Sequence, residues 1–397
     1  MSLQSYETAS IQGCSAMAEV QDIFSISFPE YCRTRFVPVE SRKVAQAIMN
    51  CRTSALGGHI DRCPECGYER NAYNSCRNRH CPKCQTLKKE QWIGRRCEDI
   101  LDVPHFHVVF TVPCELHTLF LQNPATLYGL LFRASANTIK ELAVDTNHLG
   151  ALPGFTSVLH TWGQNLSYHP HIHMVVTGGG ITKEHAWKYS RKKFFLPVRI
   201  ISKLFRGKFL AELRTLYKDG RIRYHGTDGT RASSEDFSTL IAACYAKDWC
   251  VYCKQPFSGT GGVFSYLGRY THRVAISNHR IQDVTDTHTT FSWRDYADKN
   301  ITKNMTIENT EFIRRFLLHV LPHGFTRIRH YGLYAPRNKA TKLAACRKAL
   351  GSRTVPKQPK ESTQELLFRI LGRDVSVCPC CNTPLRQYAL ARASPAC

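Results

Sequence analysis

The chain contains no run of apolar residues that approaches the roughly 20 needed to cross a bilayer. Its first ten residues, MSLQSYETAS, also lack the basic start and apolar stretch of a secretion signal. Acidic residues are scarce, because 31 Asp and Glu stand against 54 Lys and Arg and leave a formal net charge of +23. We therefore expect a cytoplasmic protein with an anionic partner, and nucleic acid is favoured over a membrane surface.

Internal repeats are absent, and the composition divides the 397 residues into three regions. Residues 1–98 hold a short helical segment near 38–50 and the densest cluster of Cys and His. Residues 99–300 alternate between strand-like and helix-like patterns, and residues 301–397 are the most basic. This interleaving predicts a mixed α+β domain rather than a β-sandwich.

The strands and helices of the middle region are predicted from the periodicity of apolar residues. Strands are expected at 106–112, 157–162, 171–177, 273–277 and 289–293. Helices are expected near 125–146, 198–217 and 234–248.

Eighteen cysteines could indicate a disulfide scaffold, but such scaffolds are small secreted domains. Here the cysteines stand at the spacing of metal ligands. Cys63-Pro-Glu-Cys66 and Cys81-Pro-Lys-Cys84 are two CxxC knuckles separated by 14 residues. Two knuckles supply the four thiolates of a tetrahedral site, so we predict that these four cysteines bind a structural zinc ion.

Four further residues could bind a second zinc ion in a cross-braced arrangement: Cys51, His59, Cys76 and His80. The alternative is that the cysteines are small buried apolar groups and the histidines are only hydrogen-bonded. Residues 76–96 carry seven Lys and Arg against one acid, which indicates that this module also contacts DNA, through Arg77 and Arg79 among others. Near the C-terminus, Cys378-Pro-Cys-Cys381 resembles half of a zinc ribbon, but only Cys397 follows it.

A pair of histidines, His171 and His173, lies within the strand expected at 171–177. Residues i and i+2 of a strand point to the same face, so the two imidazoles converge. A hairpin could bring His160 or Gln164 alongside as a third ligand. Two imidazoles and one further ligand leave coordination positions open, as in catalytic metal sites, whereas histidines on strands are often only hydrogen-bonded.

Two tyrosines, Tyr266 and Tyr270, stand at helical i, i+4 spacing in YLGRYTHR, with Arg269 and Arg273 as a parallel basic pair. Tyrosines at this spacing are often core residues. The adjacent guanidiniums and His272, and the glycines that precede the motif, favour a functional site instead.

The chain contains no acid between Arg314 and Lys360, where 12 Lys and Arg occur. Solvated helix faces usually mix charges of both signs, so this stretch, interrupted by aromatic residues, favours contact with phosphates and stacked bases. Arg327 and Arg329 are the candidates within it.

Several stretches together resemble the two-tyrosine rolling-circle transposases of the insertion-sequence ninety-one family. This family belongs to the endonucleases named for a His-hydrophobic-His motif. The matching stretches, in order, are GGHIDRCPECG, YNSCRNRHCPKCQ, FHVVFTVP, LHTWGQNLSYHPHIH, YLGRYTHRVAISNHRI and RRFLLHVLPHGFTRIRHYG. They span about residues 50–335.

The resemblance implies a central antiparallel sheet in a catalytic domain at 99–300. A zinc-binding, DNA-contacting module at 1–98 would precede this domain, and a basic C-terminal DNA-binding region and tail at 301–397 would follow it. It also implies that Mg²⁺ or Mn²⁺ at His171, His173 and a third ligand assists Tyr266 or Tyr270 in attacking single-stranded DNA, at the ends of a mobile element and at its target. The location implied is the bacterial nucleoid.

Two other functions compete with this interpretation. A plasmid replication initiator or relaxase would use the same chemistry, but the zinc module and the YLGRYTHR block favour a transposase. A zinc-dependent DNA-binding regulator without catalysis would leave the histidine pair and the paired tyrosines unexplained.

Overall fold

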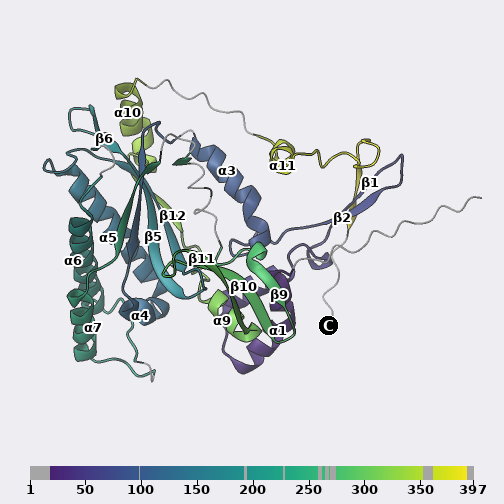
Figure 1. Ribbon diagram of the computed structural model, residues 1–397, viewed down its shortest axis with the longest axis horizontal. Coiled ribbons are helices and arrows are strands. Elements are labelled where there is room, and N and C mark those ends of the chain that lie inside the picture. The colour runs from purple at the N-terminus through teal and green to yellow at the C-terminus, as the bar shows by residue number, and fades with distance from the viewer. Residues whose placement is uncertain are drawn as a thin grey trace, which may run out of the picture.

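A five-stranded antiparallel sheet forms the centre of the protein, as seen in a computed structural model (Figure 1). The structure describes residues 18–97, 99–191, 195–226, 229–257, 262–263, 268, 274–351 and 361–390. The strand order is β12-β4-β5-β3-β8, and all neighbours are antiparallel. The strands are β3 (His105–Thr111), β4 (Gly154–Trp162), β5 (Tyr168–Thr177), β8 (Val251–Phe257) and β12 (Ile328–Gly332).

Helices cover one face of this sheet and enclose the main hydrophobic core. They are α4 (His117–Gln122), α5 (Pro124–Val144), α6 (Val198–Lys218) and α7 (Ser234–Ala246). Alternate residues of the strands, such as Ile172 and Met174 of β5, are fully buried against Leu131 and Phe205 of these helices. Because side chains alternate along a strand, the residues between them face the opposite side of the sheet.

A second core lies beside the sheet. It joins the N-terminal helices α1 (Val20–Thr34) and α2 (Val39–Met49) to α9 (Asn309–Leu317) and to the antiparallel sheet β11-β10-β9. The strands are β9 (Ile281–Val284), β10 (His288–Asp295) and β11 (Ile301–Glu308). The boundary expected at residue 300 therefore falls inside the β10–β11 hairpin, and β12 of the basic C-terminal region belongs to the central sheet.

A small ribbon projects away from both cores (Figure 1). Its sheet has the order β13-β1-β2, formed by β1 (Gly58–Arg62), β2 (Glu69–Tyr73) and β13 (Arg386–Leu390). The helix α3 (Gln85–Cys97) begins beside the second core, directly after Cys84, and runs to the sheet on the side away from α6. The other strands and α-helices of the described residues are β6 (Gly179–Ile181), β7 (Trp187–Tyr189), α10 (Ala344–Ala349) and α11 (Thr363–Leu371).

The α+β class and the central antiparallel sheet are confirmed. The expected helices correspond to α2, α5, α6 and α7, and four of the five expected strands form. The strand expected at 273–277 is wrong for its described residues, since 274–277 are irregular. The strand expected at 289–293 is β10, which lies in the smaller sheet rather than the central one. Among the described residues, no helix is long and apolar enough to cross a membrane.

Candidate metal centre and cysteine clusters

Three histidines converge on the face of the central sheet that the main core leaves free. His171 and His173 project from β5, and His160 of β4 lies directly opposite His171 in the strand register. Their ligand nitrogens all lie within 4.8 Å of one another, and the Nε2 atoms of His171 and His173 are 3.0 Å apart. The pairing of two adjacent strands therefore forms this histidine trio.

The geometry of the trio fits a divalent ion. Two nitrogens bound at right angles to one ion at about 2.1 Å would stand about 3.0 Å apart, close to the spacing observed. Nδ1 of His171 lies 2.6 Å from the carbonyl oxygen of His169. When Nδ1 carries the proton and donates a hydrogen bond to that oxygen, Nε2 keeps its lone pair for a metal. Three imidazoles also leave coordination positions open for substrate oxygens.

The third member of the trio is His160 rather than Gln164. The side-chain amide of Gln164 instead donates to the hydroxyl of Tyr296 at 3.0 Å, beyond the end of β4. The ring of Trp162 stacks on that of His160, with centroids 4.7 Å apart, and restricts its orientation.

His107 of β3 is a site residue that the sequence interpretation missed. Its Nε2 lies 2.9 Å from Nδ1 of His173. Burial lowers the pKa of His107 to about 3, so this imidazole is neutral near pH 7 and can accept a hydrogen bond from the Nδ1–H of His173. The available signal was His105-Phe106-His107, a second His-hydrophobic-His pattern on a neighbouring strand.

The two tyrosines of the YLGRYTHR motif, Tyr266 and Tyr270, lie outside the described residues, as do Arg269 and Arg273. The described residues nearest to Tyr266 on either side are Val263 and Gly268. Val263 is buried and packs with Val175, whose strand position is two residues beyond His173.

Four cysteines form a cluster embedded in the second core, here called the inner quartet: Cys51, Cys76, Cys81 and Cys84. The sulfur of Cys84 lies 3.4 Å from that of Cys51 and 3.6 Å from that of Cys76. Four thiolates at tetrahedral spacing are the ligand set of a structural zinc site.

This grouping corrects the expected one. Cys63 and Cys66 do not lie with Cys81 and Cys84, but face two cysteines near the other end of the chain. We call this second cluster the outer quartet: Cys63, Cys66, Cys378 and Cys381.

The two histidines expected as ligands of a second zinc ion lie in neither quartet. Nε2 of His59 lies 3.3 Å from Oδ1 of Asp61. Nε2 of His80 accepts a hydrogen bond from the backbone N–H of Leu321 at 3.4 Å. Both histidines therefore bond to protein groups, which corrects the expected Cys2His2 set.

The arginines expected to contact DNA differ in their surroundings. Arg77 is exposed. Both terminal nitrogens of Arg79 donate to backbone carbonyls, at 2.5 and 2.8 Å, so this side chain joins two parts of the fold. Arg327 is buried, which lowers its pKa to about 10, and the guanidinium of Arg329 lies over the ring of Phe132. Among these four arginines, only Arg77 is exposed to solvent.

Comparison with known proteins identifies the family. Residues 23–112 match the family described as "Transposase zinc-binding domain", and residues 154–342 match that described as "Putative transposase". The "Putative transposase y4qJ" of Sinorhizobium fredii is 45% identical over 374 residues, which are 92% of this chain and 93% of the relative. The chain belongs to the transposases of the insertion-sequence ninety-one family.

Other similarities are weaker. The transposase for insertion sequence element IS801 of Pseudomonas savastanoi pv. phaseolicola is 28% identical over 342 residues, 84% of this chain and 80% of the relative. The structure of the conjugative relaxase TrwC in complex with oriT DNA aligns with a TM-score of 0.25 and 12% identity, over 63% of this chain and 73% of that one. A TM-score this low supports no inference about this transposase.

Proposed function

We propose that this transposase nicks and rejoins single-stranded DNA through a 5′-phosphotyrosine intermediate and so moves an insertion sequence by a rolling-circle route. The observation that carries the proposal is the histidine trio, because three converging imidazoles with open coordination positions are suited to phosphate chemistry. A regulator that only binds DNA would have no use for this arrangement.

The trio supports metal-assisted cleavage. A divalent ion bound there would polarise the scissile phosphate and stabilise the leaving 3′-oxygen. His160, His171 and His173 would hold the ion, and His107 would fix the orientation of His173. Imidazole nitrogens are softer donors than the oxygens that Mg²⁺ prefers, so the trio favours a transition-metal ion such as Mn²⁺.

The described neighbours of the tyrosine motif support a nucleophile on the same side of the sheet. Val263 packs against Val175, Trp92 and Ile100, and a Cβ added to Gly268 would lie 2.9 Å from the Ile93 side chain of α3. Tyr266 follows Val263 by three residues and precedes Gly268 by two. We therefore infer that the tyrosine motif acts on this face of the sheet.

In the covalent step, a tyrosine hydroxyl oxygen attacks phosphorus and loses its proton to solvent. The bond between phosphorus and the 3′-oxygen breaks, and that oxygen takes up a proton from solvent and leaves as a 3′-hydroxyl. The reverse attack by a 3′-hydroxyl rejoins DNA and releases the tyrosine, so no nucleotide hydrolysis is needed. Two tyrosines allow two such exchanges in sequence.

Binding of DNA is supported by charge. The chain carries +23, and α3 presents Lys88 and Arg95 to solvent between the ribbon and the histidine face. We infer that α3 and Arg77 contact the phosphates of the single strand, and that Arg269 and Arg273 do so beside the tyrosines. The nucleoid would then be the site of action.

The decisive experiment is to trap the covalent adduct. Wild-type protein, incubated with single-stranded element ends and Mn²⁺, should give a DNA-linked species on a denaturing gel. The double variant Tyr266→Phe, Tyr270→Phe should keep its fold and DNA affinity but form no adduct, because only the nucleophilic oxygens are removed. Tyr245→Phe, at an exposed position on α7, is the matched control and should behave as wild type.

Mass spectrometry of the digested adduct identifies the modified residue. Tyr266 is the expected site of first attack, and each single Phe variant should be defective in transposition. A phosphate linked to a residue other than Tyr266 or Tyr270, or full activity of the double variant, contradicts the proposal.

A further inference from the structure

The two halves of the outer quartet share a sequence pattern. One is Cys63-Pro-Glu-Cys66-Gly67, and the other is Cys378-Pro-Cys-Cys381-Asn382. Each has proline after the first cysteine. Each also has, after the second, one of the two residue types that most readily adopt a left-handed backbone conformation.

The backbones of the two knuckles follow the same course. The N–H of Cys63 donates to the carbonyl of Tyr68 and that of Cys378 donates to the carbonyl of Thr383, both at 2.8 Å and both spanning five residues. The N–H of Gly67 donates a hydrogen bond to the carbonyl of Cys63. In the same way, the N–H of Asn382 donates to the carbonyl of Cys378. These are two copies of one turn.

The residue that closes each turn takes a positive φ, 73° at Gly67 and 62° at Asn382. The third CPxC motif of the chain, Cys81–Cys84, behaves differently. Its following residue, Gln85, has φ −85° and starts the helix α3. The structural likeness therefore pairs Cys63–Cys66 with Cys378–Cys381.

The four sulfurs are placed for one tetrahedral ion. Cys63 Sγ lies 3.4 Å from Cys381 Sγ, and Cys66 Sγ lies 3.5 Å from Cys378 Sγ. Thiolates bound to zinc at about 2.3 Å in a tetrahedron would stand about 3.8 Å apart. The backbone N–H of Cys380 also points at Cys378 Sγ, at 3.4 Å, as expected for a group that stabilises thiolate charge.

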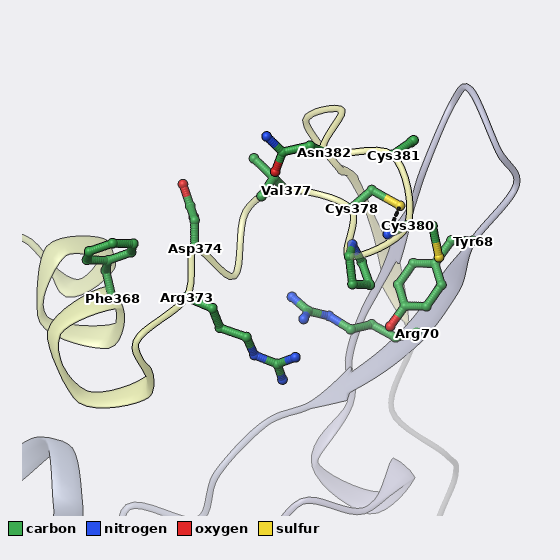
Figure 2. A pocket seen from close by; sticks show the side chains of 11 residues that line it. Tyr68, Arg70, Phe368, Arg373, Asp374, Val377, Cys378, Cys380, Cys381 and Asn382 are labelled. Carbon is green, nitrogen blue, oxygen red and sulfur yellow. Dashed lines mark hydrogen bonds between the residues drawn. The ribbon is translucent and has the colours of Figure 1, made fainter.

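Apolar packing does little to support this region. Within the described residues, no member of β1, β2 or β13 belongs to a hydrophobic core cluster, and four of the five residues of β13 are exposed. A cavity of about 660 Å³ separates the C-terminal knuckle from α11, as Figure 2 shows for Cys378 and Phe368. Three five-residue strands without a core are marginal in water, so another source of stability is needed.

We propose that the outer quartet binds one Zn²⁺, separate from that of the inner quartet, and that this ion clasps the C-terminal strand β13 onto β1. Soft thiolate ligands in a closed set of four select zinc and leave no position for catalysis. The ligands come from segments 312 residues apart, so the site is complete only when the end of the chain has folded back.

The consequence is that the metal orders the C-terminal segment 361–390. Apart from Leu366 of α11, which is buried, the contacts that accompany it are mainly polar. Gln387 donates to Asp61 at 3.1 Å, and Arg70 donates to the carbonyl of Val375 at 2.6 Å. Without the ion, these part-buried contacts and the backbone pairing with β1 are too few to keep β13 from detaching.

The test is metal stoichiometry in the full chain. Cobalt-substituted protein should show two equivalents of tetrahedral cobalt with thiolate charge-transfer absorption, a signal that cobalt bound to histidines does not give. The variant Cys378→Ser, Cys381→Ser should lose one equivalent and keep the other, and protease should cleave its 361–390 segment at least tenfold faster. Its main melting transition should stay close to that of wild type.

Cys380→Ser is the matched control, because this exposed cysteine lies in the same knuckle but outside the quartet. It should retain two equivalents. One thiolate-bound equivalent in the wild-type chain overturns the proposal, and so do two in the double variant. The wild-type measurement stands even if a variant folds poorly.

Discussion

The histidine trio and the outer quartet both bring together ligands from separate segments of the fold, but different forces hold them. The trio lies on two paired strands, β4 and β5, whose other face is buried in the main core, so its geometry exists before any ion binds. The outer quartet lies on short strands without a core. Here the ion would supply the stability, since binding of structural zinc contributes about 10–16 kcal/mol in small domains.

The inner quartet is intermediate in how far its stability depends on a metal ion. Cys51, Cys81 and Cys84 are buried among the side chains of the second core, together with Phe24 and Phe316. Its ion would add to stability that packing already provides. The comparison teaches that two similar sets of four cysteines in one chain can depend on their metal to different degrees.

The largest effect is expected on removing the metal. A strong chelator should speed amide hydrogen exchange in β1, β2 and β13 by at least 10³-fold, because those strands then have no stable folded state. The amides of β4 and β5 should remain protected, and added zinc should restore the ribbon. Equal loss of protection in both sheets would mean that they fold as one unit.

The next effect concerns the trio. The double variant His171→Ala, His173→Ala should lose about 10³-fold or more in strand cleavage, since a Lewis acid contributes several kcal/mol to such a reaction. DNA binding should be nearly intact, and the melting temperature should fall by only about 2–4 °C.

Ile172→Ala provides the matched contrast, because its side chain points from the same strand into the main core. It should destabilise the fold by about 2–5 kcal/mol while the folded molecules still cleave DNA. Cleavage that survives in the histidine variant would show that the histidines are only packing residues.

These two variants also show what the sequence could predict. The alternation in HIHMVV placed both histidines on one face and Ile172 on the other, because the period of a strand is local information. The choice of His160 over Gln164, and the contact of His107 with His173, depend on how β3, β4 and β5 pair. Strand register is set by the whole sheet and not by any one segment.

The cysteines show the same limit more strongly. Each knuckle could be recognised from its own residues, and the CxxC spacing marked as candidate ligands four cysteines that each lie in one of the two quartets: Cys63, Cys66, Cys81 and Cys84. The grouping of the knuckles into two quartets could not be predicted, because the cysteine that faces Cys63 lies 318 residues away in the sequence. The left-handed residue after each outer knuckle, Gly67 or Asn382, was the local clue to which knuckles match.

A smaller effect is expected at His107, which we propose as a positioning residue. His107→Ala should raise the Mn²⁺ concentration needed for half-maximal cleavage by about 10–100-fold, since groups that orient a ligand contribute that much to metal affinity. Cleavage at saturating Mn²⁺ should return to near wild type. His107→Gln keeps an acceptor and should shift the midpoint less. An unchanged midpoint, or a loss that saturating metal does not restore, would refute the role.

The smallest effect separates the metal clasp from the ion pairs around it. Arg369 of α11 lies 3.3 Å from Glu90 of α3 and also pairs with Glu361, but its side chain is 52% exposed. Solvent and salt screen such pairs, which contribute about 0.2–1 kcal/mol. Arg369→Gln should therefore speed proteolysis of the 361–390 segment by less than about fivefold, and less still at high salt, with both zinc equivalents retained. Arg373→Gln, an exposed neighbour, is the control. If Arg369→Gln released the segment as fully as Cys378→Ser with Cys381→Ser, the ion pair and not the metal would be what holds the C-terminal strand in place.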